Sequence, residues 1–125
     1  MGEVRYLFDT NAVLYELKGV SSPIEFEPSD IIYCSFITKI ELLSCRDVSE
    51  EELDAIRSSL SALEVLYIDE EIVRNSVYVR QNSNLKLPDA IICATALQKE
   101  AVLITADKQL IKAAEHIGVR AKNAL

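Results

Sequence analysis

Short apolar runs alternate with amphipathic segments along most of this 125-residue chain, and this alternation most constrains its fold. We expect strands at 4–8, 31–35, 65–68 and 101–105, with a short fifth strand at 119–122. Continuous apolar runs of this length are typical of parallel strands that are buried on both faces. The chain is therefore predicted to be an α/β protein, with helices on both sides of a parallel sheet.

The segments between these runs carry helix signals. Ser49 is followed three residues later by Glu52, a capping box, Pro88 lies in a first turn, and Gly118 stops a last one. The expected helices are 12–18, 36 to about 46, 49–62, 69–81, 88–99 and 108–117. The length fits one domain, so residues 1–125 are expected to form a single domain.

Composition limits the class of protein. Half of the residues are apolar, no apolar run is long enough to span a membrane, and the start of the chain lacks the layout of a signal peptide. Cys34, Cys45 and Cys93 lie in apolar stretches and match no zinc-binding spacing. We expect buried, reduced thiols in a cytoplasmic protein.

The net charge of −7 comes from 13 basic and 20 acidic residues. This balance argues against a nucleic-acid partner and leaves room for a basic protein partner. If the four acids described next were neutralised by metal, 16 acids would face 13 bases, so the charge weakens a nucleic-acid role without excluding it.

Four acids stand at the ends of the predicted elements. Asp9 and Asp107 each close an apolar run, Glu41 lies just past another, and Asp89 opens a helix. Two unit charges roughly 4 Å apart repel by about 4 kcal/mol at an effective dielectric near 20. A fold that gathers several carboxylates needs a cation, and a cation held by oxygens suggests phosphate chemistry.

Each acid also has a structural alternative. Asp9 or Asn11 could cap the first helix, Asp107 the last, and Asp89 could be an ordinary first-turn acid. Taken singly, capping is the commoner role. Together, however, the acids should repel one another, so we predict that replacing Asp89 or Asp107 with alanine raises thermal stability without metal.

Glu41 has two opposed interpretations. Thr38 and Glu41 fit a capping box, with Ile37 and Leu42 placed as a hydrophobic staple. If the helix instead begins by residue 36, Glu41 falls between Ile37 and Cys45 on an apolar surface. A glutamate buried there would need a partner, and a metal ion would serve.

Connectivity groups three of these acids. The carboxyl ends of parallel strands meet at one edge, which brings together Asp9, Asp107 and the start of the helix that carries Glu41. Asp89 opens the helix that leads into the fourth strand. If that helix runs straight, it begins at the opposite edge, so topology alone leaves Asp89 outside the site.

The acidic motifs together resemble those of PIN-domain proteins, above all the small VapC-type ribonuclease toxins of type II toxin–antitoxin systems. The most specific piece is Lys86-Leu87-Pro88-Asp89-Ala90, and the resemblance runs from Tyr6 to about Leu110. The other matching stretches are Asp9-Thr10-Asn11, Ser35-x-x-Thr38-x-x-Glu41-Leu42 and Leu103-Ile104-Thr105-Ala106-Asp107.

The resemblance implies an α/β/α sandwich with a parallel sheet of about five strands in the order 3-2-1-4-5, which sets Asp9 beside Asp107. It also brings Asp89 into the site. The family's catalytic and metal-binding quartet falls on four positions of this chain, Asp9, Glu41, Asp89 and Asp107. Its supporting polar positions fall on Thr10, Asn11 and Thr105.

The implied activity is cleavage of RNA that depends on one or two Mg²⁺ or Mn²⁺ ions held by the quartet. Family members typically form homodimers, and a cognate antitoxin protein blocks their acidic cleft. Many relatives carry a further aspartate two residues after the last quartet acid. Here Asp107 is followed by Lys108-Gln109, which leaves a second metal position uncertain.

Basic and apolar residues outside the quartet remain ambiguous. Lys39, Lys86 and Lys108 lie near quartet acids and could contact RNA phosphates or simply balance charge. His116 is interpreted as a histidine at a helix C-terminus. A dimer surface could include members of one apolar set, namely Leu14, Leu17, Ile72, Val73, Val77 and Val79.

Three other functions compete with a toxin. A phosphoacceptor receiver domain would need an acidic pair after the first strand and a late lysine, which this chain lacks. A PIN-fold binding module without turnover is disfavoured by the intact quartet. A PIN nuclease of RNA processing stays open, and an upstream antitoxin reading frame would favour the toxin.

Overall fold

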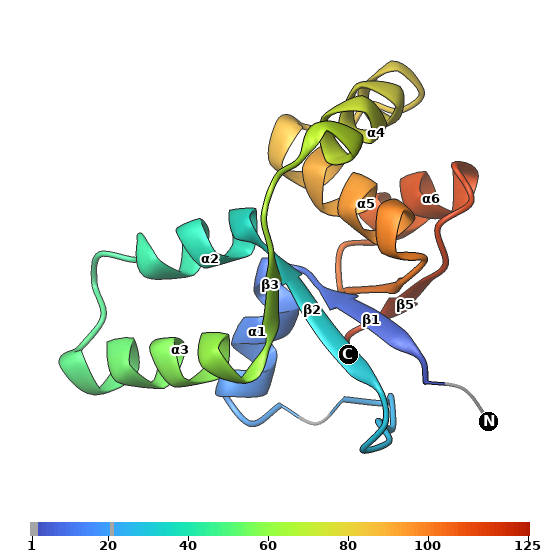
Figure 1. The fold of residues 1–125 in the computed structure, drawn as a ribbon. Coiled ribbons are helices and arrows are strands. Elements are labelled where there is room, and N and C mark those ends of the chain that lie inside the picture. Colours follow the sequence, from blue (N-terminus) through green and yellow to red (C-terminus); the bar gives the residue numbers. More distant parts are fainter. Residues whose placement is uncertain (1–2, 21) are drawn as a thin grey trace.

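The sheet confirms the expected topology. The computed structural model describes residues 3–20 and 22–125. All of its strand pairs are parallel, in the order β3-β2-β1-β4-β5 (Figure 1). The strands are β1 Arg5–Phe8, β2 Ile31–Ser35, β3 Glu64–Leu66, β4 Val102–Thr105 and β5 Ala121–Asn123.

Helices cover both faces, as predicted. They are α1 Thr10–Leu17, α2 Phe36–Leu43, α3 Glu50–Ala62, α4 Glu70–Gln81, α5 Leu87–Lys99 and α6 Lys108–His116. Side chains alternate along β1, so Tyr6 and Phe8 join the core beneath α1 and α3, whereas Leu7 joins the core beneath α5 and α6. All three are buried, which is why the strand reads as a continuous apolar run.

The pair α4 and α5 departs from a simple crossover. Helix α4 leaves the end of β3 and packs mainly against α5, not against the sheet (Figure 1). Helix α5 then returns along the sheet toward β4. Because α5 leads into the amino end of β4, it runs antiparallel to the strands and begins near their carboxyl edge. The prediction that topology leaves Asp89 at the opposite edge was therefore wrong.

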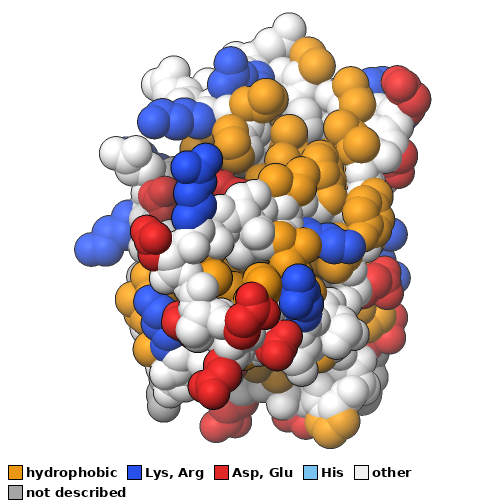
Figure 2. Space-filling model, turned by 90° about the vertical axis from the view of Figure 1, so that its left-hand side faces the viewer, with side chains coloured by type: hydrophobic (Ala, Val, Ile, Leu, Met, Phe, Trp, Pro, Cys, Tyr) orange, Lys and Arg blue, Asp and Glu red, His pale blue; other side chains and the backbone are white. Residues whose placement is uncertain are grey.

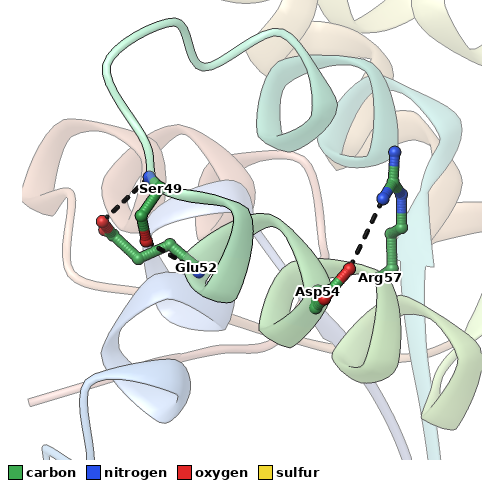
Figure 3. Close-up of polar contacts among 4 residues, drawn as sticks. All are labelled: Ser49, Glu52, Asp54 and Arg57. Atoms are coloured by element: carbon green, nitrogen blue, oxygen red, sulfur yellow. Dashed lines mark hydrogen bonds and ion pairs between the residues drawn. The ribbon is translucent and has the colours of Figure 1, made fainter.

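Local capping signals were confirmed at α3 and revised at α2. The Ser49 hydroxyl accepts from the Glu52 N–H, and the Glu52 carboxylate accepts from the Ser49 N–H, both at 3.1 Å (Figure 3). The exposed ion pair of Asp54 with Arg57 on the same helix, 3.5 Å long, contributes little. Helix α2 is capped by Ser35.

Two sequence predictions are corrected in and after α2. Because Ser35 caps this helix, Thr38 lies inside it and the expected Thr38–Glu41 capping box was wrong. The helix also ends at Leu43, short of residue 46. Cys45 is therefore exposed, against the prediction of a buried thiol.

Cys34 and Cys93 are buried and free, as expected. Burial raises the pKa of the Cys34 thiol to about 11 and that of Cys93 to about 12. Both thiols therefore stay protonated and behave as small apolar groups. Across residues 3–20 and 22–125, no helix is long and apolar enough to cross a membrane.

Candidate active site at the carboxyl edge of the sheet

Asp9 follows β1, and its two carboxylate oxygens accept hydrogen bonds from two different groups. One carboxylate oxygen, Oδ1, accepts from the Ala12 N–H at 2.8 Å and so caps α1. The other, Oδ2, accepts a short hydrogen bond from the Thr105 hydroxyl. Asp9 is only 7% exposed. The capping role considered from sequence is therefore real, but it uses one oxygen only.

Asp107 is joined to Asp9 through Thr105. The Asp107 carboxylate caps α6 by accepting from the N–H groups of Gln109 and Leu110, at 2.9 and 3.1 Å. Its own N–H donates to the Thr105 hydroxyl at 3.0 Å. Strands β1 and β4 are neighbours, with Phe8 opposite Ile104, so the two acids leave adjacent strands at one edge.

Glu41 reaches the same edge from α2. It accepts a short hydrogen bond from the Thr10 hydroxyl, which also lies 3.1 Å from the Thr38 hydroxyl. Glu41 is exposed, and so are Ile40 and Cys45 beside it. The expectation that Glu41 is buried among apolar side chains was therefore wrong, and desolvation is not a reason for it to need a metal.

Asp89 lies in the first turn of α5 and is half-buried. Burial is the main reason that its pKa is raised above 3.8, and the negative charges of Asp107 and Glu41 raise it further. The Lys86 ammonium opposes this rise. The carboxylates of Asp107, which follows β4, and Glu41, on α2, are therefore close enough to raise the pKa of Asp89. This places Asp89 at the same edge of the sheet.

The pKa of Asp9 carries the same signature. Burial raises it above 3.8, the hydrogen bonds from Thr105 and Ala12 lower it, and the charges of Asp89 and Asp107 raise it again. All four acids therefore take part in this repulsion. Asp89 and Asp107 act on Asp9, and Asp107 and Glu41 act on Asp89. The edge stores negative charge that a cation would relieve.

The donor chemistry fits a hard cation, since carboxylate oxygens are the ligands that Mg²⁺ and Mn²⁺ prefer. The spacing is looser than a formed metal centre. Within residues 3–20 and 22–125, no three His, Cys, Asp or Glu side chains lie close enough together to hold a metal ion as they stand. Repulsion between unneutralised carboxylates accounts for such an open arrangement.

The supporting polar residues differ in what they contact. Thr105 is fully buried and links Asp9 to Asp107, and Thr10 links α1 to Glu41. Asn11 is exposed. The sequence suggested Thr38 only as a helix cap, whereas its hydroxyl contacts Thr10 from a fully buried position. Its place three residues before Glu41, in a stretch that resembles the family, was the available signal.

The three lysines near the quartet also differ. Lys39 donates to the Tyr67 hydroxyl at 2.8 Å and lies over its ring, so its ammonium is engaged beside the site. Lys86 lowers the pKa of Asp89 and so acts on the site electrostatically. Lys108 is exposed at the start of α6. His116 is exposed in the last turn of α6, as predicted.

Comparison with known proteins gives one family match and several similar structures. The PIN-domain family model matches residues 6–116. A toxin–antitoxin complex from Klebsiella pneumoniae contains a chain 28% identical to this one, with 85% of this chain and 89% of that chain covered and a TM-score of 0.66. No curated protein sequence matches significantly.

Two further structures share the fold at lower identity. DNA-bound VapBC from Salmonella typhimurium is 21% identical, covers 98% of this chain and 99% of that chain, and has a TM-score of 0.78. VapBC2 from Rickettsia felis, bound to a promoter DNA fragment, is 19% identical, with 96% and 98% covered and a TM-score of 0.75. Each covers nearly the whole of both chains, so the likeness is one of complete folds.

Proposed function

This chain belongs to the PIN-domain family, and we propose that it is a metal-dependent endoribonuclease, the toxin of a type II toxin–antitoxin pair. Membership in this nuclease family assigns it to the hydrolases of phosphodiester bonds. The observation that carries the proposal is the common edge at which the pKa values of Asp9 and Asp89 are both raised, chiefly by burial and further by neighbouring carboxylates of the same edge. The toxin role is supported by the 28% identical chain of a toxin–antitoxin complex.

Four residues would hold the metal, namely Asp9, Glu41, Asp89 and Asp107. A bound Mg²⁺ or Mn²⁺ ion would supply an activated water and offset charge on the phosphate. Glu41 and Asp107 are exposed, and the hydrogen bonds that each accepts use one carboxylate oxygen, which leaves the other oxygen for an ion. The quartet needs to hold at least one ion. A second ion would have one ligand fewer than in many relatives, because Gln109 stands at the position two residues after Asp107 where they carry an aspartate.

The protein's own groups prepare this site. The Thr105 hydroxyl and the Ala12 N–H hold Asp9 in one orientation, each using one oxygen. The Thr10 hydroxyl orients Glu41. These hydrogen bonds hold the carboxylates in fixed orientations although they repel one another. The side chains therefore lose less conformational freedom when the ion binds. A phosphate can approach such an edge only after its charge has been offset.

An antitoxin is the expected protein partner. The acidic edge and the net charge of −7 favour a basic segment, and an arginine placed among the carboxylates would compete with the metal. We also propose a cytoplasmic location, in line with three free cysteines, since cytoplasmic conditions keep thiols reduced.

A homodimer is supported by one apolar face. This face consists of Ile68, Val73, Val77 and Leu87, which are between 39% and 55% exposed. They line a groove of about 490 Å³ at the end of β3, along α4 and at the start of α5. Figure 2 shows hydrophobic side chains gathered on one side of the molecule, with charged ones around them. An exposed apolar surface of this kind marks an interface.

The residues suggested for a dimer surface differ in how far they are exposed. Ile72 and Val79 are buried in the core, at 1% and 0% exposed, and so are unavailable to a partner. Leu14 and Leu17 are partly buried against the core beneath α1 and α3. Val73 and Val77 remain exposed and belong to the apolar face.

The test is cleavage of single-stranded RNA by protein freed of any partner, with Mg²⁺ or Mn²⁺ and with excess chelator. We expect cleavage only with metal, and we expect Asp9→Asn to reduce it by at least about a thousandfold, as for loss of one main catalytic charge. The amide keeps an oxygen for the Ala12 N–H, so the fold should persist.

A matched control is Asp54→Asn, which removes the same charge from the exposed surface of α3. This variant should cleave like the wild type. Cleavage that continues undiminished in chelator would contradict the metal mechanism. RNA that is bound but never cut, with or without metal, would favour a non-catalytic PIN-fold module.

A further inference from the structure

A polar groove lies beside the acidic edge and has no assigned role. It occupies about 400 Å³ between the turn that joins α4 to α5 and one face of α6. The side chains that matter here are Asn82, Asn84, Leu85, Gln109, Lys112 and His116. We refer to it as the polar groove. It is separate from the apolar face on α4.

The chemistry of the polar groove differs from that of the chain as a whole. No aspartate or glutamate lines it, although the chain carries a net charge of −7. Its lining offers amides, a hydroxyl, an imidazole and the Lys112 ammonium. Amides and ammonium groups are the side chains that contact base edges and phosphates, respectively.

The polar ends of these side chains are available. Across the described part of the chain, the side chains of Asn84, Gln109 and Lys112 have no hydrogen bond to another protein group. Lys112 also forms no ion pair, since the ion pair among the described residues joins Asp54 and Arg57 on α3. All three are exposed. A ligand in the groove could therefore bind them without breaking an existing contact.

The wall that presents Asn84 is held in place. The Ser83 hydroxyl donates to the Val79 carbonyl at 2.7 Å and accepts from the Leu85 N–H at 3.3 Å. The Asn82 amide donates to the Tyr78 carbonyl at 2.8 Å, and Arg80 donates to the Leu85 carbonyl at 3.1 Å. This turn is therefore preorganised, with the Asn84 amide at its exposed tip.

The polar groove starts at the candidate active site. The N–H of Gln109 donates to the Asp107 carboxylate, and Leu85 lies four residues before Asp89. From Gln109 to His116 the α6 face runs about 10 Å at 1.5 Å per residue. That length is enough for a short stretch of single-stranded RNA next to the cleaved bond.

We propose that the polar groove binds the single-stranded RNA that flanks the cleaved bond. Lys112 contacts a phosphate, and the amides of Asn84 and Gln109 contact base edges and set the sequence preference. This inference rests on the proposed ribonuclease function and names a substrate-binding site for it. RNA is a more suitable occupant than a protein segment, because no acid lines the groove and the exposed polar ends of Asn84, Gln109 and Lys112 match base edges and a phosphate.

The test compares Lys112→Gln with Lys18→Gln, using metal-loaded protein and a labelled single-stranded RNA of mixed sequence. Lys18 follows α1 at the opposite edge of the sheet, so the control removes the same charge away from the groove. Glutamine is a good helix former, so neither substitution should disturb a helix. The circular dichroism spectrum of each variant is to be compared with that of the wild type to check folding. Both lysines are exposed.

We expect Lys112→Gln to raise KM about fivefold at 0.1 M salt with kcat unchanged, and to reduce the salt slope of kcat/KM by about 0.7, as for loss of one phosphate contact. Lys18→Gln should match the wild type. If wild-type protein cleaves RNA but the two variants behave alike, the groove inference is overturned and the ribonuclease proposal stands.

A second variant tests base recognition. Asn84→Ala should change the ratio of kcat/KM among homopolymers of A, C, G and U, while leaving the salt slope unchanged. Unchanged ratios would overturn that part of the inference. Wild-type protein that neither binds nor cuts any RNA would overturn both proposals. Weaker binding of an acidic peptide by Lys112→Gln, with RNA kinetics intact, would assign the groove to a protein partner.

Discussion

Thr105 is the residue that turns two separate helix caps into one site. Its hydroxyl donates to Asp9 and accepts from the Asp107 N–H, and it does so while fully buried. A hydroxyl can donate one hydrogen bond and accept another at the same time. The bond also opposes the rise in the pKa of Asp9 that burial causes. Thr105 therefore helps to keep Asp9 ionised, as a metal ligand must be.

Stability should rise as the metal-free protein is acidified from neutral pH. The pKa values of Asp9 and Asp89 are raised above 3.8 in the folded state, chiefly by burial. The folded protein therefore binds protons more tightly than the unfolded chain, so unfolding becomes more costly as pH falls through the raised values. Below 3.8 both states are protonated and the gain ends.

Urea unfolding in chelator at several pH values measures this effect. Asp89→Asn should flatten the pH dependence and raise stability at neutral pH. Added Mg²⁺ should stabilise the wild type at neutral pH and do so less as the carboxylates protonate. Identical pH profiles for the wild type and Asp89→Asn would show that the repulsion at Asp89 is negligible.

At the scale of elements, the direction of α5 decides where Asp89 lies. A helix that leads into the amino end of a parallel strand runs antiparallel to that strand, so α5 begins near the carboxyl ends of the strands. Helix α4 packs against α5, and α5 returns along the sheet to β4 (Figure 1). The sequence showed the break at 82–84, and the direction of α5 follows from its connection to β4.

Asp107 shows how an element changes the expected effect of a substitution. The sequence favoured a gain of stability on Asp107→Ala, by relief of repulsion. The structure shows that Asp107 caps α6 through two N–H groups. We therefore expect Asp107→Ala to destabilise the metal-free protein by about 1 kcal/mol, the usual cost of a lost cap.

Thermal unfolding in chelator checks this expectation, with a drop in Tm of about 4 °C for a domain of this size. Asp107→Asn is the matched variant, because asparagine caps helices as well as aspartate while removing the charge. It should be at least as stable as the wild type. A higher Tm for Asp107→Ala would mean that repulsion outweighs the cap.

For the whole molecule, the apolar face and the acidic edge are two separate surfaces, and the proposed homodimer concerns the apolar face alone. Val77 lies 52% exposed on the apolar face. If that face joins two copies, Val77→Glu should convert the dimer to a monomer, because two glutamates would be buried without partners at a two-fold interface. Sedimentation at micromolar protein measures the change in mass.

Val20→Glu is the control, since Val20 is 40% exposed after α1 and outside the apolar face. This variant should keep the mass of the wild type. A wild-type protein that sediments as a monomer would refute the homodimer. The RNA-cleavage proposal would be unaffected, because all four quartet acids come from one chain.

The sequence by itself determined the strands, their parallel direction and three acids at one edge. These follow from rules that act locally or through connectivity, such as continuous apolar runs and the capping box at Ser49. The strand order, with β1 beside β4, was implied by the family resemblance and is confirmed by the sheet. Tertiary structure decided the rest. It exposed Glu41 and Cys45, left Asp89 half-buried near Asp107 and Glu41, and opened the polar groove between segments far apart in sequence. Burial and charge–charge distance depend on how elements pack, and packing is not local.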